Sequence, residues 1–72
     1  MRPTYTIYTE FTEYTSTDDW TSIEKEEHTD SWEQALGALA IYAADPDCIQ
    51  CFIYDRNGYD VIRYINPEYR VL

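Results

Sequence analysis

The sequence predicts a single small α+β domain of order ββαββ, with a four-stranded antiparallel sheet and one helix packed on one face. Three observations lead to this prediction: two-residue alternation near the N-terminus, one apolar stripe at helical spacing, and two strand-like segments around an Asn-Gly turn. With 72 residues, the chain is long enough for one domain, which we assign to residues 1–72.

The first two elements are predicted strands. From Thr4 to Thr15 the side chains alternate, and threonine and tyrosine both favour strands. One face takes Tyr5, Ile7, Thr9 and Phe11, and the other takes Thr4, Thr6, Tyr8 and Glu10. Ser16-Thr17-Asp18-Asp19 is typical of a turn, and Trp20–Glu27 alternates again, so the two segments are expected to form a hairpin.

The third element is a predicted helix. Thr29-Asp30-Ser31 supplies N-cap candidates, and Asp30 with Glu33, or Ser31 with Gln34, could form a capping box. The expected core stripe is Trp32, Ala35, Leu36, Leu39 and Ala43, and the expected outward face is Gln34, Gly37, Ala38, Ile41 and Ala44. Asp45-Pro46-Asp47 ends the helix, because the residue before a proline disfavours the α conformation.

The last two elements are again predicted strands, at Cys48–Tyr54 and Tyr59–Ile65. Asp55-Arg56-Asn57-Gly58 between them is a hairpin turn sequence. Asn66-Pro67 is expected to end the second strand.

Cys48 and Cys51 form a CxxC motif, but they lie in a predicted strand rather than at the start of a helix. Residues three apart in a regular strand lie about 10 Å apart and point to opposite faces. Disulfide geometry needs Cα atoms within about 7 Å, so no intrachain disulfide is expected. A structural zinc site needs four ligands, and His28 is the only histidine. Both cysteines are therefore predicted to be small, buried or half-buried hydrophobic residues.

The charge of the chain is concentrated in one segment. Eleven of the fourteen acidic residues lie between Glu10 and Asp47, where Lys25 is the only lysine or arginine, and the formal net charge of the chain is −9. Such self-repulsion destabilises a small fold, so the segment is either a solvated surface or a surface that meets a basic partner. The helix N-terminus favours acids in its first turn, which accounts for Asp30 and Glu33 without a partner.

On the second reading, the partner-binding residues are acids of the first two strands, of the loops around them and of the helix start, with two neighbouring tyrosines. These residues are Glu10, Glu13, Asp18, Asp19, Glu24, Glu26, Glu27, Asp30, Glu33, Tyr8 and Tyr14. Glu24 and Glu26 share a strand face at a spacing of about 6.8 Å. Tyrosine is enriched in interfaces, and Tyr8 and Tyr14 are expected to face outward near Glu10 and Glu13.

The density of this charge approaches that of a nucleic acid. A compact chain of this length has a radius of gyration near 11 Å and a face of roughly 30 Å, which gives about one charge per 3 Å. Duplex DNA has one charge per ~1.7 Å. A basic groove that holds DNA or RNA would attract such a surface, whereas direct nucleic-acid binding is disfavoured by like charge.

Catalysis has little support in the sequence. There is no Ser/His/Asp set and no glycine-rich phosphate loop, so we expect no enzyme activity, no catalytic residue and no cofactor. No metal site is assigned: a divalent ion at Asp45 and Asp47 or among the glutamates remains open, but EF-hand spacing is absent. The N-terminus lacks the apolar stretch of a secretory signal and no apolar run could span a membrane, so the expected compartment is the cytoplasm.

The chain resembles the small, acidic, phage-encoded anti-CRISPR proteins, some of which are α+β domains that imitate DNA. The resemblance lies in its length, its charge and the segment Asp30-Ser31-Trp32-Glu33-Gln34-Ala35-Leu36, followed by Cys51-Phe52-Ile53-Tyr54-Asp55-Arg56-Asn57-Gly58. It implies an inhibitor that acts in the cytoplasm of the infected host and occupies the basic DNA-binding channel of a CRISPR effector complex of type I. The family has no shared catalytic motif, so the resemblance assigns no residue roles.

Two other functions stay open. The chain could be a protein-interaction module, such as an antitoxin or a dimerising accessory protein, that uses the apolar helix face around Ile41. It could also be a chaperone-like or histone-like charge partner without mimicry. A monomer is the expected state for an acidic mimic, which would bind a basic DNA-binding protein rather than a membrane or a nucleic acid.

Overall fold

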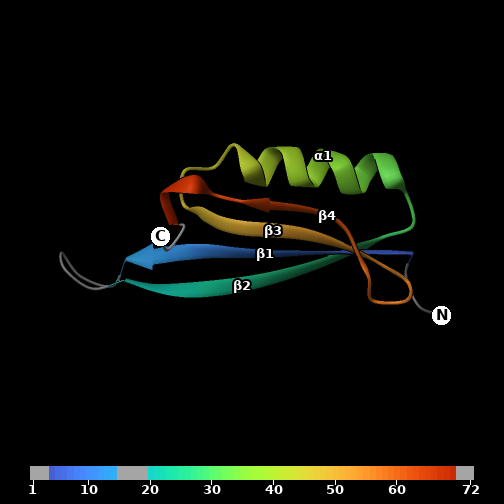
Figure 1. Cartoon of the computed structure of the whole chain (residues 1–72), viewed down its shortest axis with the longest axis horizontal. Coiled ribbons are helices and arrows are strands. Elements are labelled where there is room, and N and C mark those ends of the chain that lie inside the picture. The colour runs from blue at the N-terminus through green and yellow to red at the C-terminus, as the bar shows by residue number, and fades with distance from the viewer. Residues whose placement is uncertain (1–3, 15–19, 70–72) are drawn as a thin grey trace.

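The computed structural model describes residues 4–14 and 20–69, which form one sheet and one long helix (Figure 1). The strands are β1 (Tyr5–Tyr14), β2 (Trp20–Thr29), β3 (Cys48–Asp55) and β4 (Asp60–Ile65). The helix α1 spans Trp32–Ala43, and a short 3-10 helix, η1, spans Pro67–Tyr69. All strand pairs are antiparallel in the order β2-β1-β3-β4, which confirms the predicted fold class. The turn predicted at Ser16–Asp19 lies outside the described residues.

The helix packs on β1 and β3 and makes only slight contact with β2. The fully buried hydrophobic residues of the described chain are Ile7, Ala35, Cys48, Cys51 and Ile53, and larger side chains from both layers surround them. The molecule is elongated, with extents of 43 × 24 × 19 Å and a radius of gyration of 13.2 Å. It is therefore longer than the compact globule assumed from chain length, and the same charge is spread over a longer surface.

The N-cap of α1 is Ser31, which is one of the three candidates predicted from the sequence. Its hydroxyl accepts a hydrogen bond from the Gln34 amide at 3.2 Å. The capping box is not reciprocal, because the Gln34 side chain accepts a bond from the Thr29 hydroxyl at 2.8 Å instead. The predicted outward face is correct except for Ala38, which packs half-buried against the core.

Cys48 and Cys51 are both free, and both lie in the core, which corrects the expectation that they point to opposite faces. A β-bulge explains the difference. Glu10 pairs with Gln50 while the next residue of β1, Phe11, pairs with Cys48, so Ile49 is an extra residue in β3. The extra residue reverses the alternation and turns Cys48 to the same face as Cys51.

Asn66 holds the end of the sheet around this bulge. Its side-chain amide donates to the Cys48 carbonyl at 2.9 Å and its backbone amide donates to the Ile49 carbonyl at 2.8 Å. The β3–β4 turn closes with a bond from the Gly58 amide to the Asp55 carbonyl at 3.0 Å, and Gly58 has a φ of 86°. β4 begins at Asp60, one residue later than predicted, because Tyr59 belongs to the turn.

Candidate binding face

The helix packs on one face of the sheet, and the other face, called the open face below, has no α-helix over it within residues 4–14 and 20–69. Strand alternation turns Ile7 and Phe11 to the helix, and therefore turns Thr6, Tyr8 and Glu10 away from it. The cross-strand register extends this open face over all four strands. Its residues include Ser22, Glu24, Glu26 and His28 on β2, Thr6, Tyr8, Glu10 and the buried Thr12 on β1, Gln50, Phe52 and Tyr54 on β3, and Arg63 and Ile65 on β4.

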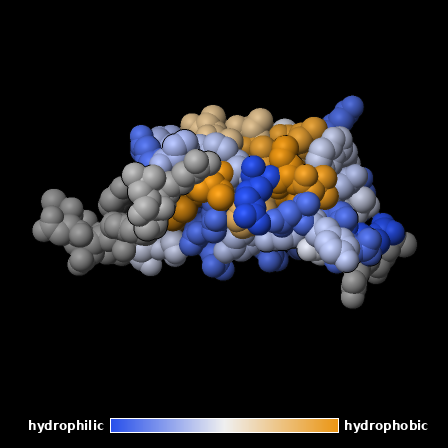
Figure 2. Space-filling view, in the orientation of Figure 1, coloured by the Kyte–Doolittle hydropathy of each residue, from blue (hydrophilic) through white to orange (hydrophobic). Residues whose placement is uncertain are grey.

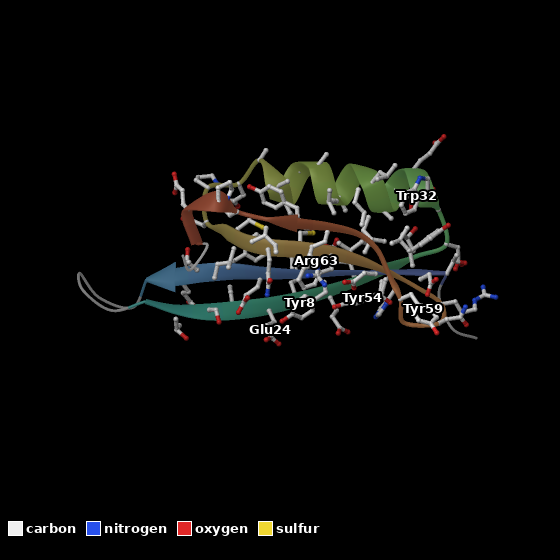
Figure 3. All side chains as sticks on the ribbon, in the orientation of Figure 1. Tyr8, Glu24, Trp32, Tyr54, Tyr59 and Arg63 are labelled. Carbon is white, nitrogen blue, oxygen red and sulfur yellow. The ribbon has the colours of Figure 1, made fainter. Side chains whose placement is uncertain are left out.

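An aromatic cluster occupies the middle of the open face. Tyr8 stacks on Phe52 with ring centroids 6.0 Å apart and planes 10° apart, and Tyr54 meets Phe52 edge-on at 6.0 Å. The guanidinium carbon of Arg63 lies 4.9 Å from the centre of the Phe52 ring, a cation–π contact, and Arg63 also pairs with Asp60. Figure 3 shows Tyr8, Tyr54 and Arg63 close together, with Glu24 beside Tyr8 on the β2 side. The cluster is half-buried, so its edges remain accessible.

Acidic side chains border this cluster. Glu24 and Glu26 are both exposed on the open face, which confirms the prediction that they share one face of their strand. Glu26 lies directly opposite Tyr8 in the register. Burial and the neighbouring Glu24 carboxylate raise the pKa of Tyr8 to about 12, so its hydroxyl stays protonated at neutral pH. In Figure 2 the lower, β2 side of the molecule is hydrophilic, while apolar side chains reach the surface nearer its middle.

Glu10 and Glu24 face each other directly across β1 and β2. Like charges in this position destabilise a sheet. The Glu10 carboxylate accepts a bond from the Gln50 amide at 2.8 Å, whereas Glu24 has no ion-pair partner among the described residues. The fold therefore keeps an exposed carboxylate in an unfavourable position.

Glu27 does not belong to this face. It pairs with Ile7 in the register and lies on the helix side, where the Tyr42 hydroxyl donates to it and Lys25 forms an ion pair at 3.1 Å. The Tyr42 bond and the Lys25 charge lower the pKa of Glu27. Glu27 follows Glu26 by one residue and points the other way, so the predicted partner-binding residues Glu24, Glu26 and Glu27 do not all lie on one face.

The remaining predicted residues are dispersed. Glu13 is exposed, but its alternation places it on the helix-side face of β1. Asp30 accepts bonds from the Thr4 amide at 2.9 Å and the Thr4 hydroxyl at 3.1 Å, which lower its pKa, so it has a structural role. Glu33 is exposed in the first turn of α1.

Three predicted residues cannot be placed on either face. Asp18 and Asp19 lie outside the described residues. Tyr14 ends β1, but its side chain lies outside the described part of the chain.

The structure adds three residues to the candidate site: Phe52, Tyr54 and Arg63. The signal was present in the sequence, because Gln50, Phe52 and Tyr54 alternate in the third predicted strand as Thr6, Tyr8 and Glu10 do in the first. What the sequence did not supply was the pairing of β1 with β3, which brings the two sets together at the centre of the sheet.

No group of three or more His, Cys, Asp or Glu side chains is arranged to hold a metal ion within residues 4–14 and 20–69. Burial raises the pKa of Cys48 to about 11 and also raises that of Cys51, whose Sγ lies 3.4 Å from the Thr9 hydroxyl. No helix in the described part of the chain is long and apolar enough to span a membrane.

Comparison with known proteins gives no relative: no family model matches the chain, and no curated protein or solved structure is significantly similar to it.

Proposed function

We propose that this chain is a non-enzymatic binding protein whose open sheet face docks on a basic, nucleic-acid-binding surface of a partner protein. The observation that supports this most directly is the position of Glu24 and Glu26. They are exposed, without cationic partners among the described residues, and they border an accessible aromatic cluster on the uncovered face.

The chemistry of the face fits arginine and lysine side chains. A guanidinium can stack on an aromatic ring while its N–H groups bond a carboxylate. Arg63 on Phe52 with its Asp60 partner is an internal example of this arrangement. Tyr8 provides a second aromatic ring, and the neighbouring Glu24 and Glu26 provide carboxylates, so an arginine of the partner protein could bind there in the same way.

The unfavourable Glu10–Glu24 pair also supports a functional reading. A charge kept for solubility has no reason to lie opposite a like charge at the centre of a hairpin. A partner that places a cation there would remove the repulsion on binding. The excess of negative charge argues that the partner, rather than this chain, is the nucleic-acid-binding protein.

From the resemblance noted above, the partner we propose is a CRISPR effector complex in the bacterial cytoplasm, with this chain as a monomeric, phage-encoded inhibitor. The test is a pull-down from a CRISPR-bearing bacterial lysate, washed at ~0.1 M and again at ~0.5 M salt, where exposed charges are screened over shorter distances. The expected result is an effector complex or another nucleic-acid-binding protein, displaced by added DNA and lost at the higher salt. A salt-resistant partner with no nucleic-acid function would contradict the proposal.

A second candidate interface is the outward face of α1. Ile41 is 71% exposed, and its neighbours Gly37, Ala40 and Ala44 are exposed and uncharged. This face fits the alternative of an apolar interaction module. Binding through it would be insensitive to salt and lost in Ile41→Asp.

A further inference from the structure

The outer edge of β2 is an unusually complete strand edge. β2 has ten residues, contains no proline, and pairs with β1 without a register shift from Tyr5–Thr29 to Tyr14–Trp20. The opposite edge of the sheet, β4, has six residues and a register shift where it pairs with Tyr54. An edge strand leaves every second backbone N–H and C=O unpaired, and a long regular edge can therefore accept an additional strand.

A groove beside β2 leaves room for the side chains of an added strand. Because α1 packs on β1 and β3, it leaves an open groove of about 500 Å³ between itself and β2. Ile7, Ala38, Thr29, Gln34 and Glu27 are among the residues that line it. An added strand would lie about 4.8 Å outside β2, and the side chains on its helix-side face would point toward this groove.

The charge of β2 selects among possible occupants. In an antiparallel pairing of two β2 strands centred on Lys25, Glu24 of one copy would lie opposite Glu26 of the other. Like charges directly opposite each other are destabilising, so this register disfavours a second copy of this chain. A strand with a lysine or arginine at every second position would instead place cations opposite Glu24 and Glu26.

We propose that the β2 edge binds an extended segment of the partner protein, with lysine or arginine at alternate positions, as a fifth strand of the sheet. This rests on the proposed function, because it describes how part of the basic partner is bound. The backbone ladder supplies affinity, and the cations opposite Glu24 and Glu26 supply selectivity and register.

The test uses two synthetic peptides of equal length and charge: five Lys-Val repeats, and the same peptide with every peptide-bond nitrogen methylated, so that it cannot donate backbone hydrogen bonds. Amide hydrogen exchange of the full ¹⁵N-labelled chain is followed by NMR. At a peptide concentration of ten times Kd, the outward β2 amides are expected to exchange about tenfold more slowly with the Lys-Val peptide and at an unchanged rate with the N-methylated peptide.

Two variants test the charge argument. Combining Glu24→Gln with Glu26→Gln is expected to weaken Lys-Val binding about three- to tenfold. Combining Glu33→Gln with Glu68→Gln, which removes the same charge from α1 and η1, is expected to weaken it less than twofold. Equal losses in the two double variants would contradict a specific role for β2.

Other outcomes separate the two proposals. If both peptides shift the Glu24 and Glu26 resonances equally and neither slows amide exchange, strand addition is wrong while docking on a basic surface stands. If neither peptide perturbs the open face or the edge, both proposals fail. If outward β2 amides of the free chain become protected as its own concentration rises, a second copy occupies the edge and a basic strand is the wrong occupant.

Discussion

Glu10 and Glu24 lie directly opposite each other on the paired strands β1 and β2. The Glu10 carboxylate accepts a hydrogen bond from the Gln50 side-chain amide, whereas Glu24 is exposed. Cross-strand like charges are destabilising. The hairpin therefore contains a local electrostatic conflict that a different residue at position 24 would remove.

Glu24→Gln is accordingly expected to stabilise the free protein by about 0.2–1 kcal/mol at low ionic strength, with a smaller gain at high salt. Urea unfolding of the two proteins at both salt concentrations measures this. Glu33→Gln is the control, since Glu33 lies in the first turn of α1 and its loss should destabilise the helix slightly. Equal stabilisation by both substitutions would mean that net charge, rather than the Glu10–Glu24 pair, is responsible.

The Tyr42–Glu27 hydrogen bond ties α1 to β2 and should appear in the pH dependence of stability. The bond and Lys25 lower the pKa of Glu27 in the folded state, so the stabilisation is present above the unfolded-state pKa and is lost as the pH falls. Tyr42→Phe is expected to lower the free energy of unfolding by about 1 kcal/mol at neutral pH, since the carboxylate is partly exposed.

The difference between Tyr42→Phe and the parent protein should shrink as Glu27 becomes protonated. Denaturant unfolding at a series of pH values measures it. Tyr64→Phe is a matched control, because Tyr64 also packs against the core but has no hydrogen bond to Glu27. A difference that stays constant into the acid range would mean that lost packing, not the bond to the carboxylate, causes the destabilisation.

The two cysteines are expected to be inert in the folded protein. Both are buried, and burial raises the pKa of Cys48 to about 11, so little reactive thiolate exists at neutral pH. A thiol-specific reagent should label both residues quickly in denaturant and only at the rate of unfolding in buffer. Rapid labelling of either cysteine in buffer, with the fold intact by circular dichroism, would contradict their placement in the core.

The two glycines should respond to alanine in opposite ways. Gly58 has a φ of 86°, a conformation that alanine adopts only with strain, so Gly58→Ala is expected to cost about 1 kcal/mol. Gly37 is exposed in α1, and a Cβ there would meet nothing within 4 Å. Gly37→Ala is expected to stabilise by about 0.5–1 kcal/mol. Thermal unfolding measures both, and destabilisation by Gly37→Ala would indicate that this position of α1 has a neighbour in solution.

The element order could be predicted from the sequence because each element has its own local signal. The alternation of β1, the Ser31 cap and the Asn-Gly turn depend on residues close together in the chain. The bulge at Ile49 could not be predicted, because it depends on Asn66, which bonds the Cys48 and Ile49 carbonyls from the far end of β4.

The candidate site was predicted only in part for the same reason. Alternation correctly paired Glu24 with Glu26 on one face, and the same rule would have separated Glu27 from them. The net charge of the segment places all three glutamates in one group, because a count of charges does not show which face of the strand each side chain occupies. The contribution of Phe52 and Arg63 required the strand order, which is a non-local property.

The competing interfaces can be separated with one pair of variants. Combining Glu24→Lys with Glu26→Lys reverses the charge beside the aromatic cluster, and Ile41→Asp places a charge on the outward face of α1. If the open face binds a basic partner, the double lysine variant is expected to lose at least tenfold in affinity, since each close charge pair contributes of order 1 kcal/mol and repulsion is added. Ile41→Asp should change affinity less than twofold, because its side chain lies on the other layer.

Measuring stability in the same variants makes this result specific. Reversing Glu24 replaces repulsion from Glu10 with attraction, so the double lysine variant should be no less stable than the parent protein while it fails to bind. If the double lysine variant loses both binding and stability, unfolding would account for its loss of binding. The binding of a second variant, Arg63→Ala, then tests whether the open face is the interface. That variant keeps both carboxylates and uncovers the Phe52 ring, so a partner arginine should bind it at least as well as the parent. The reverse pattern, with binding lost only in Ile41→Asp, would assign the interface to α1.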